Sequence, residues 1–131
     1  MNTVIELHDS TVAEISSRAG TVIVRFVPAY LHKSEGRPGL DCGTGWIQDA
    51  QLRFGDALVT RACPDLPCDV TDGELAFGLE RRDNEIPVPL EVTAPTELSL
   101  KFGSKHTVTV KGRSVRLELL GEAKYVEEFK P

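Results

Sequence analysis

The feature that most restricts the fold of this chain is the alternation of apolar and polar residues along residues 97–120. If residues 103–105 form a turn, Phe102 faces His106 and Leu100 faces Val108 on a neighbouring antiparallel strand. A second turn centred on residues 112–113 continues the same face into a third strand. The shared apolar face then carries Leu98, Leu100, Phe102, Val108, Val110, Val115, Leu117 and Leu119. A shift of one residue in any strand would turn its apolar side chains outward, so the pattern predicts a three-stranded meander.

Similar alternation recurs through the rest of the chain, and no stretch shows a sustained helical period. Residues 3–7 are predicted to form a first short strand. Residues 12–18 and 21–30 are predicted to pair as a hairpin across Ala19-Gly20, with Glu14 opposite Arg25. The second strand of this hairpin is apolar on both faces, which places it centrally in a sheet.

Further strands are predicted at residues 46–54, 56–62, 74–80 and 85–92, whereas the tail 121–131 fits either a strand or a single turn. Pro87 and Pro89 lack backbone donors, which favours an edge or a bulge and argues against direct pairing across Asp83-Asn84. We therefore expect a single all-β domain over residues 1–131. Its architecture is expected to be a two-layer antiparallel β-sandwich or flattened barrel of about nine or ten short strands.

The composition excludes several classes of function. Fifteen basic against twenty acidic residues give a net charge of −5, and the basic residues are dispersed, which argues against a nucleic-acid partner. No apolar run approaches the ~20 residues that span a bilayer, and the N-terminus lacks a signal-peptide pattern, so a cytoplasmic protein is expected. The three cysteines fit reduced thiols, and the spacing of Cys63 and Cys68 suits neither a zinc site nor a redox motif. No metal or cofactor is expected.

The best candidate for a binding region is the glycine-rich stretch 31–46, expected to be a long loop over residues 31–45. It carries an imidazole, carboxylates, a guanidinium and an indole. The candidate ligand- or partner-contacting residues are Tyr30, His32, Glu35, Arg37, Asp41 and Trp46. The alternative is a surface loop whose polar groups satisfy its own backbone and whose Trp46 covers the core. No motif identifies a reaction, so we expect a non-catalytic binding or interaction protein.

Two other functions remain open at this stage. One is a small enzyme with a pocket beside the loop, using His32 with Asp41 or Cys42. The other is a homo-oligomer in which a second copy buries the loop. His8 and Asp9 are adjacent on a chain read as extended, where their side chains would point apart, so they are not expected to cooperate as acid and base.

The stretch Leu7-His8-Asp9-Ser10-Thr11-Val12-Ala13-Glu14-Ile15, followed by the strand at residues 21–27, resembles the opening of assorted small bacterial β proteins. Some members of that group are immunity-type proteins that bind and neutralise a partner toxin. The likeness covers about a fifth of the chain. It implies a non-catalytic bacterial protein and assigns no functional residue.

Overall fold

Two antiparallel sheets build the structure, a computed structural model that describes residues 1–60 and 63–131. The large sheet has the order β10 (Glu91–Val92), β13 (Ser114–Phe129), β4 (Gly43–Gly55), β3 (Thr21–Ser34), β1 (Asn2–Glu6) and β9 (Glu85–Val88), with β2 (Thr11–Arg18) on β3 and β6 (Cys68–Asp69) on β2. The small sheet has the order β5 (Leu58–Val59), β12 (His106–Gly112), β11 (Thr96–Phe102), β7 (Asp72–Phe77) and β8 (Glu80–Asp83). A 3₁₀ turn, η1 (Leu7–Asp9), joins β1 to β2.

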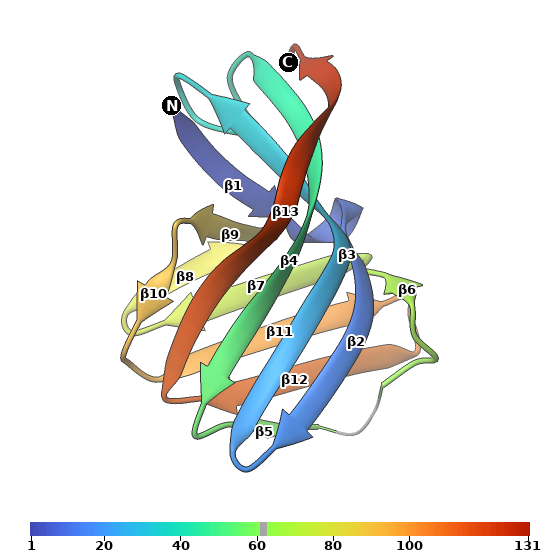
Figure 1. The fold of residues 1–131 in the computed structure, drawn as a ribbon, viewed down its shortest axis with the longest axis vertical. Helices are drawn as coiled ribbons and strands as arrows, with labels where there is room; N and C mark the ends of the chain where they lie inside the picture. Colours follow the sequence, from blue (N-terminus) through green and yellow to red (C-terminus); the bar gives the residue numbers. More distant parts are fainter. Residues whose placement is uncertain (61–62) are drawn as a thin grey trace.

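The strands of the small sheet cross behind those of the large sheet (Figure 1), and the two layers do not close into a barrel. The prediction of an all-β chain with two packed antiparallel sheets is therefore confirmed. The described residues form thirteen strands rather than nine or ten, because β5, β6 and β10 are only two residues long. Three strands are far from short, since β3, β4 and β13 have 14, 13 and 16 residues.

One hydrophobic cluster fills the space between the sheets. Its members come from both layers, and most have no exposed surface. The largest fully buried side chains are Phe26, Phe54, Ile5, Leu7, Leu31, Leu52, Leu75, Ile86, Leu98 and Leu100. Burial of these side chains is the main favourable contribution to folding, at about 1.5–3 kcal/mol each.

The first half of the predicted meander is confirmed in its register. Phe102 pairs with His106, Leu100 with Val108 and Leu98 with Val110 across the β11–β12 hairpin, with Gly103 at a φ of +69° in its turn. The second half is wrong. After Gly112 the chain leaves the small sheet, and β13 pairs with β4 and β10 in the large sheet instead of with β12.

The crossing at Gly112 brings the two layers close together, which alternation does not reveal. A Cβ at this position would lie 3.0 Å from the Gly55 carbonyl oxygen and 3.1 Å from the Ala57 Cβ, so the glycine permits close approach between the layers. The Arg113 backbone N–H then donates to the Gly55 carbonyl at 2.9 Å. Val115 still faces the core, now from the large sheet, because the inner faces of both sheets contribute side chains to one core. Leu119, expected on the buried face, is 41% exposed.

The β2–β3 hairpin agrees with the sequence prediction. Glu14 pairs with Arg25 and Ile15 with Val24, and the turn residues Ala19 and Gly20 have φ values of +50° and +81°. Two positive φ values in succession match the type of tight turn that suits the twist of a hairpin. The first strand is also confirmed as β1, which pairs with β3 and β9.

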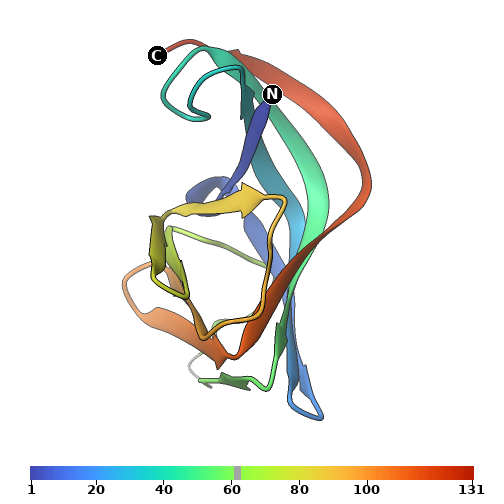
Figure 2. The same ribbon diagram turned by 90° about the vertical axis from the view of Figure 1, so that its left-hand side faces the viewer.

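The prediction of a long loop over residues 31–45 is wrong. β3 continues to Ser34 and β4 begins at Gly43, so the connection covers only residues 35–42. Residues 29–34 of β3, 43–48 of β4 and 124–129 of β13 extend beyond the small sheet, and we refer to this extension as the arm. Figure 2 shows the arm continuing the large sheet past the strands that cover its lower part.

The remaining strand predictions are partly correct. β7 ends at Phe77, and Leu79, predicted to alternate with the buried residues of this strand, lies fully exposed in the turn to β8. The predicted strand 85–92 is divided into β9, which ends at Val88, and β10, which pairs with β13. β9 carries Pro87 and is an edge strand, and it pairs with β1 rather than with β7. The predicted strand 56–62 is reduced to β5, with residues 61–62 outside the described part of the chain. The tail forms the end of β13.

Truncation of a core leucine provides a test of the packing. Leu100→Ala should lower the free energy of unfolding by about 2–5 kcal/mol, because Leu100 is fully buried between the sheets and its removal leaves a cavity. Urea denaturation followed by tryptophan fluorescence measures the loss. The matched control is Leu79→Ala, which should change stability by no more than about 0.5 kcal/mol. Equal effects of the two substitutions would contradict the assignment of the core.

Candidate functional site

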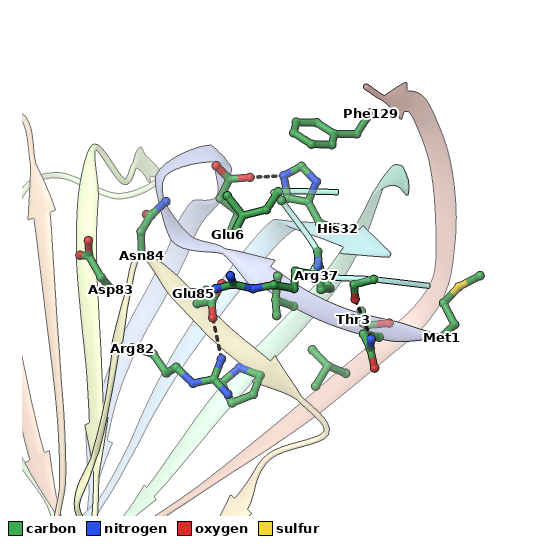
Figure 3. Close-up of a pocket in the computed structure, with 18 of the residues that line it drawn as sticks. Met1, Thr3, Glu6, His32, Arg37, Arg82, Asp83, Asn84, Glu85 and Phe129 are labelled. Carbon is green, nitrogen blue, oxygen red and sulfur yellow. Dashed lines mark hydrogen bonds and ion pairs between the residues drawn. The ribbon is translucent and has the colours of Figure 1, made fainter. Parts of the chain in front are cut away.

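An open groove lies between the arm and the β8–β9 turn. Its volume is about 790 Å³. One wall is the connection at residues 36–40, the floor is β1 with His32 and Phe129, and the opposite wall is formed by residues 82–85 and 87–89. Figure 3 shows Arg37 and His32 on one side of this groove and Arg82, Asp83 and Asn84 on the other. The groove therefore brings together four segments that are distant in sequence.

The connection over residues 35–42 is closed by its own hydrogen bonds. An Asp41 carboxylate oxygen accepts from the Arg37 backbone N–H at 2.7 Å, and the Arg37 carbonyl accepts from the N–H groups of Leu40 and Asp41 at 3.0 and 2.9 Å. The Ser34 hydroxyl donates to the Cys42 carbonyl at 2.7 Å and accepts from the Gly36 N–H. These bonds leave the side chains of Arg37 and Leu40 free to line the groove.

A carboxylate flanked by two imidazoles occupies one end of the groove. Val4 pairs with His32 and Glu6 with Tyr30 in the β1–β3 ladder, so these side chains project from the same face of the sheet. One Glu6 carboxylate oxygen contacts His32 Nε2, and the other lies 2.7 Å from His8 Nε2. His8 Nε2 is also 3.4 Å from an Asp9 carboxylate oxygen. Glu6 thus bridges a buried and an exposed histidine.

The surroundings of His32 determine which ring nitrogen carries its proton. His32 is 7% exposed, and its ring packs edge-on between Tyr30 and Phe129, with centroid distances of 5.1 Å to each. Nδ1 is buried and has no hydrogen-bond partner among the described residues. A proton on Nδ1 would be unsatisfied, whereas a proton on Nε2 is donated to Glu6, so the Nε2–H tautomer is favoured.

Asn84 determines the tautomer of His8 in the same way. The Asn84 Oδ1 accepts from the His8 backbone N–H at 2.8 Å, which directs the amide nitrogen Nδ2 toward His8 Nδ1. An amide nitrogen can only donate, so Nδ1 accepts and the ring proton lies on Nε2, facing Glu6 and Asp9. Asn84 therefore maintains His8 as a donor toward the two carboxylates.

Tyr30 passes over Gly45 to reach the last strand. Its hydroxyl donates to a Glu127 carboxylate oxygen at 2.7 Å, and a Cβ on Gly45 would overlap that hydroxyl. Burial raises the pKa of Tyr30 above its ordinary value, and the hydrogen bond to Glu127 and its negative charge raise it further. Tyr30 therefore supports the ring of His32 from behind rather than lining the groove.

The structure distributes the six predicted contact residues over four locations. His32 and Arg37 line the groove, and Tyr30 and Asp41 support it from outside. Trp46 lies elsewhere on the arm, 5.4 Å from the ring of Tyr125 and under the Lys33 ammonium group. Glu35 is exposed near the N-terminal amine, at 3.9 Å.

The enzyme alternative paired His32 with Asp41 or Cys42, but the carboxylate that contacts His32 is Glu6. Asp41 is bonded to the backbone of its own turn, and Cys42 is an exposed free cysteine. The expectation that His8 and Asp9 point apart is also wrong. Both lie in the 3₁₀ turn η1, where successive side chains are less opposed than in an extended chain.

Sequence reasoning missed Glu6, His8 and Asn84 as site residues. A signal for Glu6 was present in its place on the first strand, but no local pattern aligns that strand with residues 30–34. Asn84 lies 76 residues from His8, so only the fold brings them together.

Comparisons with protein-family models, curated proteins and solved structures gave no match to this chain. No helix within the described residues is long or apolar enough to cross a membrane.

Adding a methyl group at Gly45 tests the contact that supports His32. Gly45→Ala should lower stability by about 1–3 kcal/mol, because the new Cβ displaces Tyr30 and breaks its bond to Glu127. Denaturant unfolding measures the loss. Adding Tyr30→Ala to Gly45→Ala should remove most of the clash, so the two substitutions should not be additive. Strict additivity would place the Tyr30 side chain elsewhere.

The raised pKa of Tyr30 predicts a loss of stability in alkali. The folded state retains the Tyr30 proton above about pH 10, where an unfolded tyrosine releases it, so stability falls as the pH rises through that value. The Tyr30→Phe variant lacks this contribution. Its stability deficit at neutral pH should therefore narrow above about pH 10 in urea-unfolding experiments. A deficit that stays constant or widens in alkali would contradict the assignment.

Proposed function

We propose that this protein is a non-catalytic binding protein that holds a segment of a partner protein in the groove between the arm and the β8–β9 turn. The observation that carries the proposal is the pair of opposed walls around an open space of about 790 Å³. A groove that is open to solvent suits an extended segment better than a small molecule, which usually buries most of its surface. The sequence pointed to the stretch 31–46 as a binding region. In this proposal residues 36–40 of the connection contact the partner.

The hydrogen bonds of the connection support this proposal. Because Asp41 and Ser34 satisfy its backbone, the wall is formed before a partner arrives, and less ordering entropy is lost on binding. Leu40 is 56% exposed and lines the groove, so its apolar side chain is available to a partner. We assign Leu40 the role of an apolar anchor.

The charges of the groove indicate the chemistry of its partner. Arg82 is neutralised by Glu85 at 2.6 Å and Glu80 at 3.5 Å. Within residues 1–60 and 63–131, by contrast, the Arg37 guanidinium has no carboxylate within ion-pair distance. A segment that combines an acidic side chain for Arg37 with an apolar side chain for Leu40 would complement this wall.

The resemblance of residues 7–15 to immunity-type proteins agrees with a protein partner, and under this proposal the partner class is a toxin. In this proposal Arg37, Leu40 and His32, which line the groove, contact the partner. Tyr30 and Asp41 support these residues, and Trp46 and Glu35 lie outside the groove.

Selection from a random peptide library displayed on phage tests the proposal and requires no candidate partner. Peptides enriched on the wild-type protein should be acidic and apolar. Arg37→Glu and Leu40→Ala should each weaken the best peptide about tenfold or more, a loss of about 1.4 kcal/mol, because each removes a central contact. Fluorescence polarisation of the labelled peptide gives the affinities.

The matched control for the charge reversal is Lys105→Glu, since Lys105 is exposed in the β11–β12 turn and does not line the groove. It should leave peptide affinity unchanged. Peptides that bind the Arg37→Glu variant as tightly as the wild type, but lose affinity with Trp46→Ala, would move the binding surface to the Trp46 patch. A dimer that dissociates on Arg37→Glu in sedimentation experiments would identify a second copy as the occupant.

A further inference from the structure

We propose that Glu6, His8 and Asp9 form a binding site for a divalent transition-metal ion, with Zn²⁺ as the best-matched ion, at the end of the groove. One ligand atom from each residue lies within 4.8 Å of the other two, a separation that a single ion can bridge. Imidazole nitrogen and carboxylate oxygen are both zinc ligands in proteins. None of the three ligands is among the residues assigned to the peptide, although His32, which lines the groove, also contacts Glu6. The metal site does not depend on peptide binding.

The three ligand groups are accessible to an ion from solution. The side chains of His8 and Asp9 are 42% and 50% exposed, and that of Glu6 is 18% exposed. The carboxylates of Glu6 and Asp9 supply the negative charge that attracts a cation. The nearest wall of the groove offers no competing cation, because Arg82 is paired with Glu85 and Glu80. Three protein ligands leave at least one position on the ion open to water or to a partner.

Hydrogen bonds around the site orient its ligands. His32 donates through Nε2 to one Glu6 oxygen, which turns the other oxygen toward His8. Such outer contacts commonly fix a ligating carboxylate. The burial of His32 between Tyr30 and Phe129 keeps this donor in place, so Glu6 is held in position before any ion binds.

Asn84 opposes metal binding and thereby sets its strength. The ion takes the lone pair of His8 Nε2, so the proton of the neutral ring must move to Nδ1. There it would face the Asn84 amide nitrogen, which is also a donor, and the amide must turn away and lose its bond to the His8 backbone N–H. A carboxylate at position 84 would accept from both groups and release Nε2 for the ion.

Isothermal titration of the full chain with Zn²⁺, with Cys42, Cys63 and Cys68 changed to Ser so that thiols do not compete, tests the site. We expect one ion per chain. His8→Ala should weaken binding at least about tenfold, and Asn84→Asp should strengthen it by about tenfold, the scale of outer-contact effects in metal sites. The control His106→Ala removes an exposed histidine of β12 and should have no effect.

The added charge of Asn84→Asp is controlled by the double variant Asp83→Asn/Asn84→Asp, which keeps the net charge and should retain the stronger binding. Nitrogen chemical shifts of His8 provide a second readout. They should report Nε2–H in the metal-free protein and Nδ1–H in the Asn84→Asp variant. Binding that survives His8→Ala, or that is no stronger in the double variant than in the reference protein, would overturn the proposal.

Discussion

The pairing of β3 along both of its edges holds the rest of this structure in place. One edge pairs with β4 from Val22 to Ser34, while the other pairs first with β2 and then with β1. A strand that serves three neighbours must stay continuous through both the sandwich and the arm. Its backbone hydrogen bonds therefore keep the strands of the arm paired in a region that the small sheet does not cover. Side-chain packing alone would not hold the strands together there.

The arm bends where the pairing of its strands becomes irregular. The β3–β4 register shifts between Phe26 and Ala29, and the β13–β4 register shifts between Leu120 and Lys124, opposite Asp49 and Ile47. Such irregularities increase the local twist and bend a strand. The large sheet consequently bows past the small one (Figure 2), and the groove occupies the space between the bowed arm and the β8–β9 turn. The proposed function thus depends on a defect in regular pairing.

The polar end of the groove shows how buried hydrogen bonding can position exposed chemistry. His32 is enclosed by aromatic rings and donates to Glu6, and Glu6 in turn accepts from the exposed His8. The chain of bonds passes from the rigid β3 backbone to a turn at the surface. A fixed carboxylate beside an accessible imidazole is what distinguishes this corner from an ordinary solvated surface, where side chains sample many rotamers.

Alternation by itself determined the inward and outward faces of the β2–β3 and β11–β12 hairpins and their registers, because a strand repeats every two residues and a short turn leaves few alignments. It also predicted an edge or a bulge at Pro87 and Pro89, since a missing donor is a local property, and Pro87 lies in the edge strand β9. It did not determine which sheet β13 joins, because the side chain of Val115 would be buried whether its strand lay in the small sheet or in the large one. Nor did it show that Gly43 and Gly45 belong to a strand. Those glycines are required where the Lys33 carbonyl and the Tyr30 hydroxyl occupy the space of a side chain. The meeting of Glu6, His8 and Asn84 was likewise decided by tertiary structure alone, because contacts across 76 residues leave no periodic trace in the sequence.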